Sequence, residues 1–235
     1  MRVDVAFTPA EVKPAAGRRL IVVIDVLRAT STMVEALVNG ARAILPVGGV
    51  EEAVRKAEEL GRDSVLLCGE RDAEPIRGFH LGNSPLEFTR ERVAGKALIM
   101  STTNGTGALL AGSAAAVCLV GALLNAGAVA QRLVDRDEDA LLLCAGREGR
   151  FALEDAICAG RIARHVRRIA GRVAGNDALT AALRLSRTAP SARTLARTAA
   201  GRRLDQIGRF ADIVFCAQEN RYDVVPVLDE HRIRL

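Results

Sequence analysis

The sequence RLIVVIDVLRATSTMVEALVNG, residues 19–40, decides the fold class of this chain. Its first part, Arg19–Val26, is a β-branched apolar run typical of a strand buried on both faces. After a short polar loop, Thr30–Val38 reads as a helix, and Asn39-Gly40 suits a helix C-terminus. A buried strand followed at once by a helix predicts a unit of an α/β protein.

The same alternation continues along the chain. Further strands are predicted at Ala41–Val47, Ser64–Cys68, Lys96–Ser101, Ala115–Val120, Ala140–Cys144, Asp212–Cys216 and Tyr222–Leu228. Further helices are predicted at Val50–Leu60, Asn104–Leu110, Asn125–Val134, Leu153–Ala170, Ala178–Ser186 and Ser191–Thr198. Gly69–Asn83 is predicted to be a long loop, after which Ser84, Pro85 and Glu87 indicate a helix start with a capping box. Together these elements predict a three-layer α/β fold, with a largely parallel sheet and helices on both faces.

No low-complexity linker interrupts the chain, so we expect one compact α/β domain over residues 1–235. Two similar lobes with a boundary near residues 120–140 are the alternative. They are suggested by an internal echo between IDVLRATSTMVEALVNGARAILPVG (24–48) and LIMSTTNGTGALLAGSAAAVCLVGA (98–122). The echo is equally typical of two similar strand–loop–helix units. The Ala-rich helices predicted at Asn125–Val134 and Ala178–Ser186 leave open whether they pack within the chain or form a homodimer.

Composition narrows the class of protein. Apolar residues make up 49% of the chain, with no Trp, one Tyr and six Phe, so a sizeable and mainly aliphatic core is expected. No apolar run is long enough to span a bilayer, and the start lacks a signal-peptide pattern, so no membrane partner is expected. No cysteine pair has C-x-x-C spacing, which favours buried thiols in a reducing cytoplasm. The five cysteines are Cys68, Cys118, Cys144, Cys158 and Cys216.

The net charge of +5 is unevenly distributed, because Arg161–Arg203 contains eleven Arg and one acid, Asp177. A nucleic-acid patch is one interpretation and solvated helix faces are the other. The segment has no aromatic residues for base stacking and no nucleic-acid motif, so we expect no nucleic-acid partner. Its positive field would also steer a small anionic substrate inward.

Three loops after predicted strands are unusually polar, at the end of an α/β sheet where ligands bind. The first contains Asp25, Arg28, Thr30, Ser31 and Thr32 at a helix start, where free N–H groups and the dipole favour phosphate. An ordinary N-cap with a surface arginine is the alternative. Asp25 at the end of an apolar run weakens that alternative, because a buried carboxylate needs a partner.

The second loop, Ser101–Gly107, is rich in hydroxyls and glycine, which let backbone amides approach an anion. Its candidate ligand-binding residues are Thr102, Thr103, Asn104, Gly105 and Thr106. No Gly-Lys-Ser/Thr follows, so the loop is not a P-loop, and it is a poor dinucleotide fingerprint. A well-capped turn is the alternative.

Acidic residues mark two further loops. Glu154 and Asp155 open the predicted long helix after Arg150, where the helix dipole alone would favour acids. Glu70-Arg71 ends a strand, and a loop salt bridge is the alternative there. Asp25, Glu70, Glu154 and Asp155 are hard oxygen ligands, whereas the three histidines are scattered. This donor set favours Mg²⁺ over zinc, and with the arginines and hydroxyl turns it suits phosphoryl chemistry.

Seven segments in order along the chain resemble the signatures of the 2-phosphosulfolactate phosphatase family. They are VIDVLRATST, CGER, GFHLGNSP, TTNGT, CAGREGRFALEDAICAG, FCAQ and DVVPVL, between about Ile21 and Leu228. The resemblance implies an α/β fold distinct from the common phosphatase superfamilies. It also implies Mg²⁺-dependent hydrolysis of 2-phospho-3-sulfolactate to 3-sulfolactate and phosphate, a step of coenzyme M synthesis. The GFHLGNSP match adds Asn83 and Ser84 as substrate-binding candidates. The family usually has Asp where this chain has His80, which bears on activity if that position contacts metal or substrate.

The resulting hypothesis is that Asp25, with Glu70, Glu154 or Asp155, holds Mg²⁺ against the phosphate. Arg28, Arg71 and Arg150 would balance the charge of the substrate, and the hydroxyls of the first two loops would donate to its oxygens. Either Asp25 attacks phosphorus to form an aspartyl phosphate, or metal-bound water attacks directly. Leu27 occupies the position where haloacid dehalogenases have a second Asp, which disfavours that particular covalent mechanism. A non-catalytic binder of a phosphate- or sulfonate-bearing anion is the alternative function.

Overall fold

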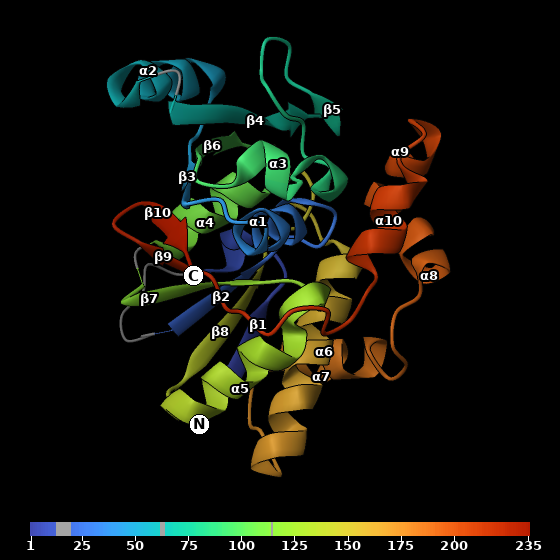
Figure 1. The fold of residues 1–235 in the computed structure, drawn as a ribbon. Helices are drawn as coiled ribbons and strands as arrows, with labels where there is room; N and C mark the ends of the chain where they lie inside the picture. The colour runs from blue at the N-terminus through green and yellow to red at the C-terminus, as the bar shows by residue number, and fades with distance from the viewer. Residues whose placement is uncertain (13–19, 62–63, 114) are drawn as a thin grey trace.

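The computed structural model describes residues 1–12, 20–61, 64–113 and 115–235, and ten strands within them form one sheet (Figure 1). The strands are β1 (Val3–Ala6), β2 (Leu20–Ile24), β3 (Ala43–Pro46), β4 (Val65–Arg71), β5 (Glu74–Pro75), β6 (Ala97–Ser101), β7 (Val117–Gly121), β8 (Ala140–Cys144), β9 (Val227–Asp229) and β10 (Arg232–Arg234). The helices are α1 (Ala29–Val38), α2 (Val50–Leu60), α3 (Arg90–Val93), α4 (Gly105–Gly112), α5 (Ala126–Arg136), α6 (Leu153–Ala170), α7 (Asp177–Leu185), α8 (Ala192–Ala196), α9 (Ala199–Gln206) and α10 (Phe210–Cys216).

The sheet consists of two parallel blocks. Strands β1, β8, β2 and β7 form the first block, and β3, β6 and β4 form the second, with the short β5 paired antiparallel to β4. The hairpin of β9 and β10 joins the blocks through antiparallel pairings with β7 and β3. The chain passes from the first block to the second after α1 and returns after β6. The first block thus contains strands from separate parts of the sequence, so the blocks are not an N-terminal and a C-terminal lobe. That the chain forms a single domain stays a prediction.

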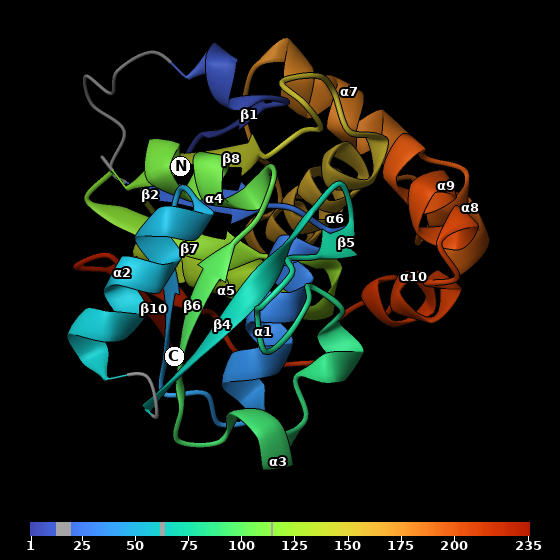
Figure 2. The same ribbon diagram turned by 90° about the horizontal axis from the view of Figure 1, so that it is seen from above.

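The antiparallel connection reverses the strand direction between the two blocks, yet the carboxyl ends of both blocks reach the same pocket. Sheet twist accounts for this. Adjacent strands rotate by roughly 20–25°, so five steps from β2 to β6 turn the second block by roughly 100–125°. Figure 2 shows the strands of the second block crossing those of the first at an angle. Twist thus brings loops from opposed blocks together.

Side-chain alternation along β2 explains the three layers. Ile21 and Val23 face a core with α1 and α4, whereas Leu20, Val22 and Ile24 face a core with α5, α6 and α7. Because both faces are covered, every residue of β2 is apolar and buried, as the sequence indicated. A third, smaller core packs α2 on β3, β4 and β6. The predicted three-layer α/β fold with a largely parallel sheet is confirmed.

Most predicted elements are present with shifts of a few residues at their ends. The predicted strand Arg19–Val26 corresponds to β2, although Arg19 lies outside the described residues. The predicted strand Asp212–Cys216 is wrong, because this segment is helix α10. There Asp212, Ile213, Phe215 and Cys216 are buried while Val214 is exposed. An apolar run this short fits both the helical and the strand periodicity, so the sequence does not decide between them. The observed burial pattern is that of a helix.

Three other local predictions also need correction. The predicted loop Gly69–Asn83 contains the end of β4 and the whole of β5, and Tyr222–Leu228 is strand only from Val227 onward. The predicted capping box is wrong. Ser84 makes no cap bond and instead donates to Asp212 Oδ1 at 2.6 Å, while Glu87 Oε2 accepts from Gly82 N–H. Only a short 3₁₀ turn, Pro85–Glu87, forms there.

The remaining sequence-level features are placed as follows. All five cysteines are free and buried. Both Ala-rich helices, α5 and α7, pack on α6 within the chain. In the basic segment, Arg161 pairs with Glu219 and Arg164 donates to the Leu183 carbonyl, so these two arginines serve the fold. None of the described helices is both long and apolar enough to cross a bilayer.

Candidate active site

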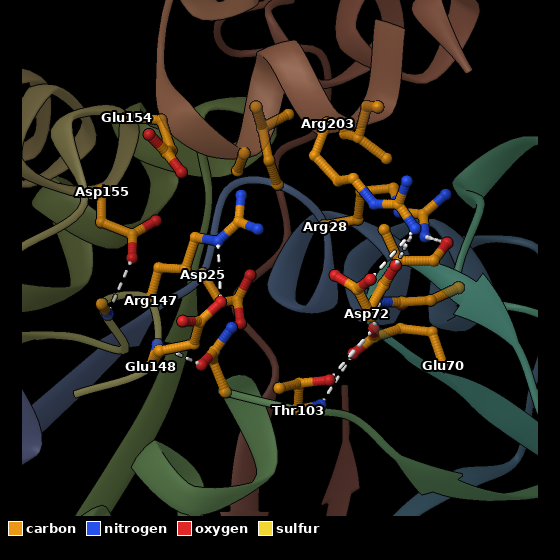
Figure 3. Close-up of a pocket in the computed structure, with 17 residues that line it drawn as sticks. Asp25, Arg28, Glu70, Asp72, Thr103, Arg147, Glu148, Glu154, Asp155 and Arg203 are labelled. Atoms are coloured by element: carbon orange, nitrogen blue, oxygen red, sulfur yellow. Dashed lines mark hydrogen bonds and ion pairs between the residues drawn. The ribbon is translucent and has the colours of Figure 1, made fainter. Parts of the chain in front are cut away.

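A polar pocket lies where the carboxyl ends of the two strand blocks meet (Figure 3). The loops after β2, β4, β6 and β8 form its walls, and one face of α9 closes it. Of the sequence candidates, it brings together Asp25, Arg28, Glu70, Asn83, Thr103, Asn104, Glu154 and Asp155. It also contains charged residues that sequence reasoning missed: Asp72, Arg147, Glu148 and Arg203.

Asp25 stands one residue beyond the end of β2 and is only 7% exposed. The Thr30 hydroxyl fixes its backbone, since it accepts from Asp25 N–H at 3.0 Å and donates to Asp25 O at 2.8 Å. The carboxylate Oδ1 accepts from Ala29 N–H at 3.2 Å. No described residue donates to Oδ2, which sits 2.8 Å from where a Cβ on Gly105 would be. This oxygen is therefore available to a ligand.

The electrostatics of the pocket centre on Asp25. The pKa of Asp25 is raised to about 7, chiefly by burial and in smaller part by the negative charges of Glu70 and Glu154, while the Ala29 N–H and Arg28 oppose the shift. Burial, and then the charges of Asp25 and Glu154, raise the pKa of Asp155 well above its usual value. Burial also raises the pKa of Glu154. Such crowding of buried carboxylates favours either protons or a bound cation.

Glu154 and Asp155 lie in the first turn of α6 and differ in their surroundings. Asp155 Oδ1 accepts from Val26 N–H at 2.8 Å, and Oδ2 accepts from Gly146 N–H at 3.1 Å. It thus fastens the loops after β2 and β8 to each other. Burial raises the pKa of Glu154, and the hydroxyl of Thr198, at the start of α9, opposes that shift. Unlike the Asp155 carboxylate, that of Glu154 does not fasten two strand-end loops to each other.

Glu70 holds two loops in place. Its Oε1 accepts from Thr103 N–H at 2.7 Å, and Oε2 accepts from the Thr103 hydroxyl at 3.1 Å and from Ala73 N–H at 2.8 Å. Asp72 and Ala73 both have positive φ and form the two-residue turn between β4 and β5. Because neither position is a glycine, no local pattern indicated this hairpin in advance.

Arg28 is fixed by buried partners. Its Nη1 pairs with Asp212 Oδ2 at 2.7 Å, with side chains 4% and 2% exposed, and its Nη2 donates to Ala73 O at 2.7 Å. Asp212 also accepts from Ser84, so α10 ties together the loop after β2 and the 3₁₀ turn. Sequence reasoning missed Asp212 because it assigned this segment to a strand.

Arg147 and Arg203 supply the other guanidinium groups of the pocket. Arg147 Nε contacts Glu148 Oε1 at 3.4 Å, and Asn104 Oδ1 accepts from Glu148 N–H at 2.9 Å. Arg147 stands in the same loop as the sequence candidate Arg150, so its loop had been recognised. Arg203 comes from α9, far along the sequence from the strand-end loops. The sequence indicates only that it belongs to the basic segment Arg161–Arg203.

Several predicted substrate-binding side chains do not line the pocket and are engaged in the fold. Ser31 donates to Val26 O and Thr32 to Asn83 O, while Thr102 and Thr106 bond each other. Arg71 donates to Glu70 O and to the Ser101 hydroxyl, and Arg150 is exposed beside a backbone bridge to Arg147. Gly105 leaves room for the Asp25 carboxylate, and the Ser84 hydroxyl donates to Asp212. A direct role of these residues toward a substrate stays a prediction.

Within the GFHLGNSP segment, Asn83 lies in the pocket and His80 lies outside it. Asn83 is 4% exposed and lines the pocket, and its Oδ1 has no partner among the described residues. His80 is exposed at the sheet edge, where Nδ1 accepts from Leu67 N–H at 2.9 Å. His80, the departure from the family pattern, therefore lies outside the pocket. A carboxylate oxygen at this position could also accept the hydrogen bond from Leu67 N–H.

The donor set fits Mg²⁺ better than a metal that needs a protein cage. Within the described residues, no group of three or more His, Cys, Asp or Glu side chains lies close enough to hold an ion. Magnesium is commonly held by one or two carboxylates, with water and substrate phosphate completing the shell. Asp25, which has a free carboxylate oxygen, and Glu154, which lines the same pocket, are the carboxylates that would hold it.

Fold and site define the class: a three-layer α/β protein with an acidic, arginine-bordered pocket at the carboxyl ends of its strands. The family model for 2-phosphosulpholactate phosphatase matches residues 6–231. Proteins described as probable 2-phosphosulfolactate phosphatase match from Caldanaerobacter subterraneus (39% identity; 91% of this chain and 89% of that protein) and Thermotoga maritima (42%; 89% of each). Another, from Clostridium beijerinckii, is 33% identical over 99% of both chains. The chain belongs to the 2-phosphosulfolactate phosphatase family, a family of phosphoric monoester hydrolases.

Proposed function

We propose that this chain hydrolyses 2-phospho-3-sulfolactate, or a closely related anionic phosphate ester, to phosphate and the free hydroxy acid, with Mg²⁺ as cofactor. One observation carries the proposal: the buried Asp25 carboxylate has a free oxygen and a pKa of about 7, among further carboxylates and arginines. The names of the relatives supply the substrate class. A role in coenzyme M synthesis and a cytoplasmic location stay predictions.

The charge balance of the pocket supports a cation. Six carboxylates and three arginines line it, so a phosphate ester would meet net negative charge. Asp25 and Glu154 would hold Mg²⁺, which would supply the charge neutralisation and Lewis-acid polarisation that phosphoryl transfer requires. Carboxylates without such a cation would repel the substrate, which disfavours a non-catalytic anion binder.

The remaining residues would orient the substrate. Asn83 and Asn104 lie in the pocket with side-chain amide N–H groups that can donate to phosphate oxygens, and Arg147 has terminal guanidinium nitrogens without a described partner. In the reaction the ester P–O bond breaks, phosphorus gains an oxygen from water, and the leaving alkoxide takes a proton. Either Asp25 attacks first or water attacks with Asp25 as its base. Rapid quenching of a single turnover of an ester with radiolabelled phosphate separates these routes, since only attack by Asp25 transiently leaves labelled phosphate on the protein.

The decisive test is phosphate release from 2-phosphosulfolactate and from a panel of phosphate esters, with Mg²⁺ and with EDTA. We expect Mg²⁺-dependent turnover, and a loss of roughly a thousand-fold or more in Asp25→Asn, because the change removes the charge at the centre of the site. Asp223→Asn, at an exposed aspartate away from the pocket, is the matched control. Turnover in EDTA equal to that in Mg²⁺, or near-normal activity in a folded Asp25→Asn protein, would contradict the proposal.

A further inference from the structure

Arg203 is the one arginine of the basic segment Arg161–Arg203 that lines the pocket in the described structure. It lies on α9, where Ala200, Arg203 and Leu204 are spaced by three and four residues and so share one helix face. That face closes the pocket opposite the strand ends, beside Asp72 (Figure 3). The last arginine of the basic segment is therefore directed to the site.

The contacts of Arg203 occupy only part of its guanidinium group. Nη2 donates to Asp72 Oδ2 and to Glu74 Oε1, each at 3.0 Å, and to Asp72 O at 3.2 Å. The two carboxylates are 70% and 64% exposed. Nε is buried, and no described residue accepts its N–H. Nε and Nη2 together form the edge on which an arginine binds an oxyanion through two parallel hydrogen bonds.

Exposure separates Arg203 from Arg28. The pair of Arg28 and Asp212 is buried, so removing either partner would leave a charge away from water, and Arg28 stays fixed. The pairs of Arg203 are solvated, and such pairs stabilise little and exchange readily. An incoming oxyanion can therefore displace Asp72 and Glu74 from Arg203 while also taking the unused Nε–H.

We infer that Arg203 recognises the second anionic group of the substrate, the sulfonate or carboxylate that is not hydrolysed, and so determines specificity. This inference rests on the proposed phosphatase function. Arg203 lies on the Asp72 side of the pocket, away from Asp155 and Glu154 (Figure 3). The phosphate would lie near the carboxylates that hold the cation, and Arg203 would bind the other end of a doubly anionic ester.

The test compares kcat/KM for 2-phosphosulfolactate and for glycerol 2-phosphate, which has no second anion. In Arg203→Ala, we expect a loss of roughly 10- to 100-fold for the first ester and less than about 3-fold for the second, because a charge-assisted contact is missing only for the first. Arg203→Lys should fall between, since it keeps the charge but not the fork. Arg202→Ala is the matched control on the same helix, because Arg202 is exposed and its guanidinium bonds, among the described residues, only to Arg197 O.

Other outcomes would overturn the inference. An equal loss on both esters would assign Arg203 to the fold, and no loss on either would remove it from recognition. If the wild type hydrolyses neither ester, the proposed function fails, and calorimetric binding of 3-sulfolactate then tests Arg203 alone. Weaker binding in Arg203→Ala or Arg203→Lys than in Arg202→Ala supports the inference; equal affinity, or no binding to the wild type, overturns it.

Discussion

At position 105 the site depends on the absence of a side chain. A Cβ on Gly105 would lie 2.6 Å from Ala29 Cβ and 2.8 Å from Asp25 Oδ2. Both contacts are too short, so Gly105→Ala must displace Asp25 or the start of α1. We expect a loss of kcat/KM of roughly 10- to 100-fold, because small displacements of a reacting group are costly, with a loss of about 1–3 kcal/mol in stability. Steady-state kinetics and urea unfolding measure the two effects.

Gly107 provides a control within the same turn of α4. A Cβ there would meet nothing within 4 Å, so Gly107→Ala should keep activity and stabilise the helix by up to about 1 kcal/mol. Equal activity in both alanine variants would show that Asp25 tolerates displacement. The sequence singled out the glycine-rich turn for approach of an anion to the backbone. The structure instead shows that Gly105 makes room for a carboxylate of another loop, a relation that no local pattern contains.

At the scale of elements, α10 joins the pocket to the C-terminal helices through Asp212. Because Asp212 and Arg28 are both buried, Asp212→Ala would leave the Arg28 charge without its partner. We expect a loss of about 3–5 kcal/mol in the free energy of unfolding, together with reduced turnover, since Arg28 lines the pocket. Urea titration and phosphate release measure these effects.

Asp205→Ala, at an exposed position on α9, is the control and should change stability by less than about 0.5 kcal/mol. An Asp212→Ala protein as stable as this control would show that water reaches Arg28. The error in assigning α10 has a physical source. After Asp212 come four apolar residues, two of them β-branched, and so short a run does not separate the periods of helix and strand. Its helical form is supported by tertiary contacts, among them those of Asp212 with Arg28 and Ser84.

At the scale of the whole molecule, the fold class and four of the pocket's loops could be predicted, because strand–helix alternation and polar strand ends are local signals. Asp25, Glu70, Glu154 and Asp155 were all found in this way, and all line one pocket. The opposed direction of the two strand blocks and the closing face of α9 could not be predicted. They depend on which strands pair across the whole sheet, and Arg203 reaches the site only through that arrangement.

Burial of these carboxylates also gives the whole protein a pH-dependent stability. The pKa of Asp25 is raised to about 7, mainly by burial and in part by Glu70, with Arg28 opposing the shift, and burial also raises the pKa values of Glu154 and Asp155. Since the folded-state pKa exceeds that of the unfolded chain, the folded protein binds more protons. This contribution to stability is fully present below about pH 4 and is lost as the pH rises to about 7.

We therefore expect the midpoint temperature of thermal unfolding of the metal-free protein to decrease as the pH is raised from about 5 to about 8. Each 1 kcal/mol of lost stability should lower that temperature by about 2–4 °C. Mg²⁺ should raise the midpoint at about pH 8 and have little effect at about pH 5, where protons occupy the carboxylates that would hold it. Asp25→Asn should flatten the pH profile and weaken the Mg²⁺ effect, because it removes the central titrating group. Thermal unfolding in EDTA and in Mg²⁺ measures all three. A midpoint that rises with pH in EDTA, or a Mg²⁺ effect equal at both pH values, would mean that these carboxyl groups are already ionised in the folded protein.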